Sequence, residues 1–449
     1  MRDEPRSAAP RAREPRRVAF EALLEFAAQP DARILECLHG EGLEPRDQAL
    51  AREIALGVVR RRDLLDHIAI GFAPRGMPAR AEARMALRIG IYQLAFLERI
   101  PPHAAVDTAV ELVDGSVRGF VNAVLRRVAE QIVQQPADDD ARPRADRLVL
   151  PGGRVLRLGL ALPHPETDTV RHLALLGSLP AFLAKRWFQR HGAARAFELV
   201  DATLRPAAVA LRTVRCTRDE LAAALHAEGV ETTASEHPRV LIWSGGVSPF
   251  ASTAWKQGRF VAQDPTAVAA AEALGAQSGE TVLDLCAAPG TKATLLAEAV
   301  GESGVVLAHD PDPKRRAKIV DNVVRLGLSR IRILEDVARG AGADRVIVDA
   351  PCSNTGVLAR RVEVRHRLDA AGIADLAAQQ RSLLGDALAL VRVGGVVVYS
   401  TCSIEREENE AVVEAALAEG GVELLEQRMT WPDPPRHDGG YFAVLRRND

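Results

Sequence analysis

Short apolar runs alternate with helical patterns over residues 263–449. Between the runs, helical patterns centre on residues 297, 319, 381 and 411. This alternation predicts a Rossmann-like, doubly wound α/β domain. The last two runs lie close together after the final helix and can add an antiparallel edge. The expected strands are 281–286, 304–309, 331–335, 345–349, 395–400, 422–427 and 440–446.

The pattern over residues 18–135 is helical throughout. Met85, Ile89, Tyr92 and Phe96 recur at spacings of 4, 3 and 4, which place them on one helix face. Pro101 and Pro102 end one helix before the next begins. This part predicts an all-α bundle at 16–135, preceded by a basic flexible tail at 1–15.

Residues 136–262 connect these two parts. Prolines and acidic residues at 136–165 predict a linker, in which two apolar pieces can form a hairpin. Residues 166–262 predict a small α+β module. Basic and aromatic residues interleave at 185–190, as in RNA-binding segments, although aromatic residues packed in a core with solvated arginines are an equal alternative. The predicted chain is therefore multidomain, and its last domain is 263–449.

Small residues follow the first strand of the α/β domain, in the sequence TVLDLCAAPGTK at 281–292. A helix begins directly after them, so the turn presents free backbone N–H groups at a helix start. Ala287, Ala288 and Gly290 leave room for a ligand to lie against the backbone. The pattern predicts a binding loop, and the alternative is a turn that binds nothing.

Two cysteines follow other strands of the same domain. Cys352 lies in DAPCSNTG at 349–356, and Cys402 lies in YSTCS at 399–403. The ends of parallel strands line the ligand crevice of an open α/β sheet. We therefore expect both thiols and the small-residue loop to face one cleft. The alternative for either cysteine alone is a small buried apolar side chain.

Acidic residues end three of the strands, at Asp310, Asp336 and Asp349. An acid at the end of the second strand is where nucleotide-binding α/β folds hold a ribose. Asp336, on the neighbouring strand, can accept from an adenine amino group. Each acid alone could equally be a turn or cap residue.

The loop matches neither the GxGxxG pattern of dinucleotide sites nor the GxxxxGK[ST] pattern of phosphate loops. One glycine with ribose and adenine acceptors suits S-adenosylmethionine better. Two thiols beside a methyl donor indicate methylation of cytosine at C5, because a thiolate that adds at C6 makes C5 nucleophilic. Asp349, near Cys352 in sequence, is expected at the N3 edge of the base.

Composition adds few constraints. The 449 residues carry a net charge of −2, so an RNA partner is not indicated by overall charge. Five widely spaced cysteines without a CxxC pair favour free thiols over disulfides or a metal site. The sequence has no long apolar run and no leader-like N-terminus. We expect a cytoplasmic monomer without a metal and without contact to a membrane.

The motifs DLCAAPGTK, DAPCSNTG and YSTCSIEREENE together resemble those of the RNA 5-methylcytosine methyltransferases. RFVAQDPTA at 259–267 and HDGGYFAVLRR at 437–447 are also similar to family motifs. Residues 89–113 and GFVNAVLRRV at 119–128 resemble the RNA-binding factor NusB. With this segment in front, residues 16–447 resemble the Sun or Fmu type, which methylates 16S ribosomal RNA.

The resemblance implies a role for each matching residue. Cys402 matches the nucleophile, and Cys352 matches the cysteine associated with release of the covalent product. The S-adenosylmethionine contacts are expected at Cys286, Ala287, Ala288, Pro289, Gly290, Thr291, Lys292, Asp310, Asp336 and Asp349.

Three positions depart from the family pattern. Thr291 stands where a second glycine is usual, and Asn354 replaces a small residue. The family commonly shows an Arg-Arg-x-Pro-Asp/Glu pattern, but here Arg360 and Arg361 are followed by Val362 and Glu363, so the proline is missing. We expect intact chemistry with a changed loop on the substrate side.

The sequence thus predicts S-adenosylmethionine-dependent methylation of cytosine C5 in small-subunit ribosomal RNA. The same chemistry on transfer RNA is an alternative. A non-catalytic RNA-binding assembly protein and a DNA methyltransferase are others. The first would be expected to have lost at least one of the thiols or acids, and the second would place its nucleophile at Cys352.

Overall fold

The computed structural model describes residues 14–29, 31–74, 76–136, 144–150 and 154–449. The chain forms two compact units. Unit 1 is Met1–Leu204 with Arg361–Arg367, and unit 2 is Arg205–Arg360 with Leu368–Asp449. Most of the basic tail predicted at 1–15, and the centre of the predicted linker at 137–143, lie outside the described residues.

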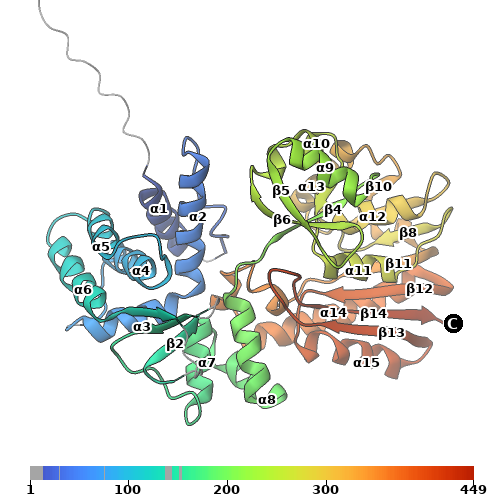
Figure 1. Cartoon of the computed structure of the whole chain (residues 1–449). Coiled ribbons are helices and arrows are strands. Elements are labelled where there is room, and N and C mark those ends of the chain that lie inside the picture. The colour runs from blue at the N-terminus through green and yellow to red at the C-terminus, as the bar shows by residue number, and fades with distance from the viewer. Residues whose placement is uncertain (1–13, 30, 75, 137–143, 151–153) are drawn as a thin grey trace, which may run out of the picture. The chain divides into compact units, whose positions relative to one another are not determined.

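Unit 1 begins with an all-α bundle, as the apolar periodicity predicted (Figure 1). Its core is continuous, and Leu64, Ile89 and Leu125 from three different helices have no exposed surface. Tyr92 packs so closely on α2 that a side chain at Gly57 would overlap its ring. The helices are α1 (Pro15–Ala28), α2 (Pro45–Arg60), α3 (Arg62–Phe72), α4 (Ala81–Phe96), α5 (Pro102–Val110) and α6 (Val117–Gln131).

A small antiparallel sheet and two helices complete unit 1. Strands β1 (Val133–Pro136), β2 (Arg147–Leu150) and β3 (Arg154–Arg157) pair in the order β1-β3-β2. Helix α7 (Thr169–Gly177) precedes α8 (Ala181–Leu204), which is interrupted at Gly192.

Unit 1 also holds a short segment from the second half of the chain, residues 361–367. Val362 is fully buried in the core of the helical bundle. Arg365, also fully buried, donates hydrogen bonds to the carbonyls of Arg60, Gly177 and Thr203. The segment is thereby fixed to three helices that lie far from it in sequence.

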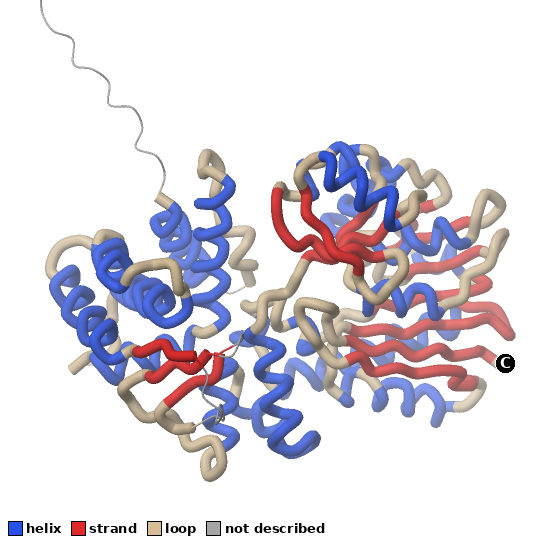
Figure 2. The backbone as a smooth tube through the Cα atoms, in the orientation of Figure 1, coloured by secondary structure: helices blue, strands red, loops and turns tan. Residues whose placement is uncertain are grey.

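Unit 2 is built on a seven-stranded sheet in the order β10-β9-β8-β11-β12-β14-β13. Figure 2 draws the strands of this sheet in red. The first five strands are parallel, and β13 and β14 form the antiparallel edge that the sequence allowed. The strands are β8 (Thr281–Asp284), β9 (Val305–His309), β10 (Ile331–Leu334), β11 (Ala343–Asp349), β12 (Val391–Thr401), β13 (Val422–Thr430) and β14 (Gly440–Arg447).

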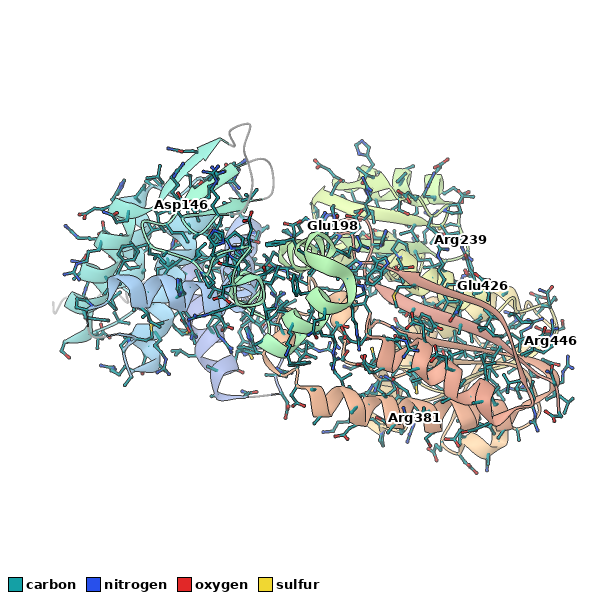
Figure 3. All side chains as sticks on the ribbon, turned by 90° about the horizontal axis from the view of Figure 1, so that it is seen from below. Asp146, Glu198, Arg239, Arg381, Glu426 and Arg446 are labelled. Atoms are coloured by element: carbon teal, nitrogen blue, oxygen red, sulfur yellow. The ribbon has the colours of Figure 1, made fainter. Side chains whose placement is uncertain are left out.

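Helices cover both faces of this sheet (Figure 1). On one face, α11 (Pro265–Ala273), α12 (Thr291–Ala299) and α13 (Pro313–Leu326) enclose a core with Val282 and Val306. On the other, α14 (Ala370–Leu390) and α15 (Glu410–Glu419) pack on Val346 and Tyr399. In Figure 3, Arg381 of α14 and Glu426 and Arg446 of the edge strands carry exposed side chains.

A second, four-stranded sheet in unit 2 has the order β5-β6-β4-β7. Its strands are β4 (Val209–Thr213), β5 (Val230–Ala234), β6 (Val240–Gly246) and β7 (Phe260–Ala262), with helices α9 (Arg218–Ala227) and α10 (Thr253–Lys256). The chain leaves β7 into α11, so this small sheet leads directly to the large one. No helix among the described residues is long and apolar enough to cross a membrane.

Candidate active site

The loop 285–290 runs from the end of β8 to the start of α12. Gly290 precedes the helix at φ 98°, a left-handed conformation that favours glycine. Thr291 begins the helix and has no positive φ. The threonine that replaces a family glycine is therefore accommodated by ordinary helical geometry. A neighbouring helix fixes the loop, because Asn322 of α13 donates to the Pro289 carbonyl at 2.9 Å.

Asp284 and Cys286 lie in buried surroundings beside this loop. Burial raises the pKa of Asp284 to about 7, against the opposing effect of Lys292 and with a contribution from Asp349. Burial also raises the pKa of the Cys286 thiol to about 12, together with Asp284 and Asp349. The Cys286 thiol thus stays protonated, which fits a structural rather than a chemical role.

The three strand-end acids have different surroundings. Asp310 is fully buried, and its Oδ2, 3.2 Å from Arg315, has no hydrogen-bond partner among the described residues. Asp336 is exposed and caps the turn after β10 by accepting from Ala338 N at 3.0 Å. Asp349 pairs with Lys292 at 2.5 Å and accepts from Ser400 Oγ at 3.1 Å. The structure thus brings Lys292 of the small-residue loop to the end of β11.

The two cysteines are neighbours. Strands β11 and β12 are paired in parallel, with Asp349 opposite Ser400, so the chain leaves both at one edge of the sheet. The Sγ atoms of Cys352 and Cys402 are 3.2 Å apart. Cys352 is buried, whereas Cys402 lines a cavity. The contact with Cys402 and burial raise the pKa of Cys352 well above its ordinary value.

Asn354 connects the two cysteine loops. It has φ 60°, as a left-handed turn residue, and its Oδ1 lies 3.2 Å from Cys402 Sγ. Its Nδ2 donates to the Cys352 carbonyl at 2.6 Å. Gly356 N donates to the Cys402 carbonyl at 3.0 Å, and a side chain at Gly356 would overlap that oxygen. The loops are therefore packed backbone to backbone.

A buried carboxylate supports both loops from behind. Glu408 is fully buried and accepts from Ser353 N at 2.8 Å and from Ser403 Oγ at 2.5 Å. Gln380 of α14 donates to the same carboxylate at 3.1 Å. Since Ser353 follows Cys352 and Ser403 follows Cys402, Glu408 fixes the spacing of the two thiols.

The cavity beside Cys402 has a volume of about 330 Å³ and lies within unit 2. Lys292, Asp349 and Cys402 line it. Arg360 also lines it, and this residue donates to Asp438 at 2.9 Å and lies 3.5 Å from Asp264. Burial and the neighbouring Asp438 raise the pKa of Asp264 to about 6. A cavity of this size can accept a single base or nucleoside.

Sequence reasoning predicted the two thiols, the loop and Asp349 as one site. The structure brings the two thiols together and pairs Asp349 with Lys292, whereas residues 285–290 do not line the cavity. Sequence reasoning did not identify Glu408, Gln263, Asp264, Arg360 or Asp438. Four of these five lie in segments that resemble family motifs. That resemblance was the only signal in the sequence that could have identified them. Asp310 and Asp336 do not line the cavity.

Comparison with known proteins agrees with this geometry. Residues 271–441 match the family described as 16S rRNA methyltransferase RsmB/F, and residues 13–130 match the NusB family. A Vibrio cholerae ribosomal RNA small subunit methyltransferase B is 32% identical over 431 residues, covering 90% of this chain and 91% of its own. A Bacillus subtilis protein described as a probable enzyme of the same name is 30% identical, covering 90% and 88%.

A solved structure, that of PH0851, covers 98% of this chain and 99% of its own with a TM-score of 0.75 and 24% identity, which supports the fold. The fold and site thus define an S-adenosylmethionine-dependent methyltransferase that carries a NusB-like helical domain. The chain belongs to the 16S rRNA methyltransferase RsmB/F family.

The residues present fit the cofactor. The small side chains of the loop leave its backbone accessible. Asp310 Oδ2, which is ion-paired with Arg315 but accepts no hydrogen bond from the described residues, is a buried acceptor suited to a ribose hydroxyl. When bound, S-adenosylmethionine supplies an electrophilic methyl group. Among the described residues, no group of three or more His, Cys, Asp or Glu could hold a metal ion.

Proposed function

We propose that this chain methylates C5 of a cytosine in small-subunit ribosomal RNA, through a covalent bond between Cys402 Sγ and C6 of the base. The observation that carries the proposal is the difference between the two thiols. Cys402 lines the cavity together with Lys292 and Asp349, whereas Cys352 lies behind it at 3.2 Å and has a raised pKa.

The proposed chemistry uses these residues in order. The Cys402 thiolate adds to C6, and electron density moves through C5 towards N3 of the base. Asp349 is assigned to the N3 edge, where Lys292 and Ser400 hold its carboxylate in place. C5 would then form a bond to the methyl carbon as the bond between that carbon and the sulfonium sulfur of the cofactor breaks, and the cofactor would leave as a neutral thioether. Loss of the C5 proton to a base allows the S–C6 bond to break, and we assign Cys352 to this release.

The cofactor contacts are proposed at the loop from Cys286 to Lys292 and at Asp310, with Asp336 and Asp349 at its margin. Buried Asp310 is suited to the ribose. Exposed Asp336 is left for the adenine amino group.

The ribosomal substrate rests on the relatives, which are named as small-subunit ribosomal RNA methyltransferases. A ribosomal RNA substrate implies that the protein acts in the cytoplasm, where ribosomal RNA is found. Transfer RNA remains the alternative substrate for the same chemistry. The other two readings are disfavoured, because the complete site argues against a non-catalytic protein and Cys352 is buried where a DNA-type nucleophile would be needed.

The test is methyl transfer to an unmodified small-subunit ribosomal RNA transcript, followed by mass spectrometry of the nucleosides. We expect 5-methylcytidine from the wild type and a loss of at least about 1,000-fold for Cys402→Ser, because the hydroxyl is a far weaker nucleophile. Cys216→Ser, at a thiol outside the cavity, is the matched control and should retain activity.

Methylation of another atom or base would overturn the assigned chemistry. Full activity of Cys402→Ser would overturn the assigned nucleophile. Faster methylation of transfer RNA transcripts than of ribosomal RNA would favour the alternative substrate.

A further inference from the structure

The wall of the cavity contains a buried donor that the proposed chemistry does not yet use. Gln263 follows β7 and is 5% exposed. It lines the same cavity as Cys402. Its Nε2 has no hydrogen-bond partner among the described residues. A buried donor without a partner is energetically unfavourable, and a ligand in the cavity can satisfy it.

The orientation of this amide is fixed by Arg212. The Arg212 Nε donates to Gln263 Oε1 at 2.6 Å. Because a guanidinium has donors only, the oxygen of the Gln263 amide must face Arg212. The NH₂ group therefore points away from Arg212, and it cannot be exchanged with the oxygen by a flip of the amide.

Arg212 itself is held rigidly. It is fully buried, and burial lowers its pKa to about 10, so it stays charged at neutral pH. Its other nitrogens donate to Glu298 at 3.1 Å, to Thr294 Oγ1 at 2.7 Å and to the Thr213 carbonyl at 3.2 Å. Glu298 and Thr294 lie on α12, the helix that begins at the cofactor loop. Gln263 is thus oriented by the same helix that carries Lys292.

We propose that the Gln263 amide donates a hydrogen bond to the carbonyl oxygen O2 of the target pyrimidine. This rests on the proposed function. Addition of the Cys402 thiolate at C6 moves negative charge to N3 and, through C2, to O2. Asp349 serves the N3 edge, and the preorganised donor of Gln263 stabilises the charge that develops on O2. Gln263 is therefore a catalytic contact, and Arg212 is its positioning residue.

The variant that isolates this role is Gln263→Glu. A glutamate keeps an oxygen for Arg212 and the size of the side chain, but it replaces the NH₂ donor by an acceptor. Gln379→Glu, on the exposed surface of α14, is the matched control with the same change in charge. Both are compared with the wild type as full chains on an unmodified small-subunit ribosomal RNA transcript.

We expect Gln263→Glu to lower kcat about 100-fold, the effect of losing one oxyanion donor, with little change in KM for RNA. S-adenosylmethionine affinity, measured by calorimetry, should stay within about threefold, and the melting temperature should match that of Gln379→Glu.

Three results would overturn the proposal. Unchanged kcat would exclude a role in the transition state. A raised KM with unchanged kcat would instead assign the amide to ground-state binding of the ribose or phosphate. A fall in both S-adenosylmethionine affinity and melting temperature for Gln263→Glu would show that Gln263 has a structural role. If the wild type itself forms no 5-methylcytidine, the proposed function fails first, and this inference falls with it.

Discussion

Asp284 is a fully buried carboxyl group at the end of β8, and its pKa of about 7 has a consequence for stability. In the unfolded chain an aspartate has a pKa near 3.9. The folded state therefore binds the proton more tightly, and the stability from this group is complete below about pH 4. It is lost as the pH rises through about 7.

We predict that Asp284→Asn removes this pH dependence, because an amide of the same shape carries no charge. The free energy of unfolding of the variant minus that of the wild type should be larger at pH 8 than at pH 5, by on the order of 2 kcal/mol. Urea unfolding at the two pH values measures the difference. If the difference between variant and wild type were the same at both pH values, Asp284 would not titrate in this range.

Single residues were predicted best where a motif joins a strand end to a reactive group. Cys352 and Cys402 could be placed together because parallel strands end at one edge of a sheet. Gln263 could not be recognised, because its role depends on Arg212, which is 51 residues away in sequence. Glu408 could not be recognised either. It lies in a charged stretch of sequence, and nothing there indicates that its carboxylate is buried and accepts from Ser353 and Ser403.

At the scale of elements, apolar runs predicted all seven strands of the large sheet, with ends that differ by at most four residues from those in the structure. Helix α11 and the burial of segment 361–367 were not predicted. The sequence of this segment, with three arginines and one histidine, is typical of a solvated loop, yet Val362 and Arg365 are fully buried in unit 1. The proline missing after Val362 predicts a changed loop on the substrate side, whereas the Val362 side chain packs in the helical core of unit 1.

Arg365 gives this segment a measurable role. It donates to carbonyls at the C-terminal ends of α2, α7 and α8, where backbone acceptors lack helical partners. We predict that Arg365→Met lowers the free energy of unfolding of unit 1 by about 2–4 kcal/mol. Chemical denaturation of the full chain, followed by hydrogen exchange in α7, measures this loss.

Arg367→Met is the control, since Arg367 is exposed and its side chain donates to the carbonyls of Asp31 and Ala32 in a loop. Equal unfolding midpoints for both variants would contradict the assigned role of Arg365.

At the scale of the whole molecule, the chain passes between its two units three times, after Leu204, Arg360 and Arg367. The five-part division expected from composition and prolines stays a prediction beside this two-part packing. Apolar periodicity reports which face of each element is buried, but it does not report which partner buries it. For that reason the bundle and the α/β domain could be recognised, whereas the packing of residues 361–367 in unit 1 could not.

The central claim is that Cys402 bonds to the base and Cys352 releases it. Wild type, Cys352→Ala and Cys402→Ala are incubated with S-adenosylmethionine and the ribosomal RNA transcript, then separated on a denaturing protein gel. Cys352→Ala is predicted to accumulate a slowly migrating covalent adduct with RNA, and Cys402→Ala to form none. An adduct that requires Cys352 and persists without Cys402 would reverse the two roles and contradict the account.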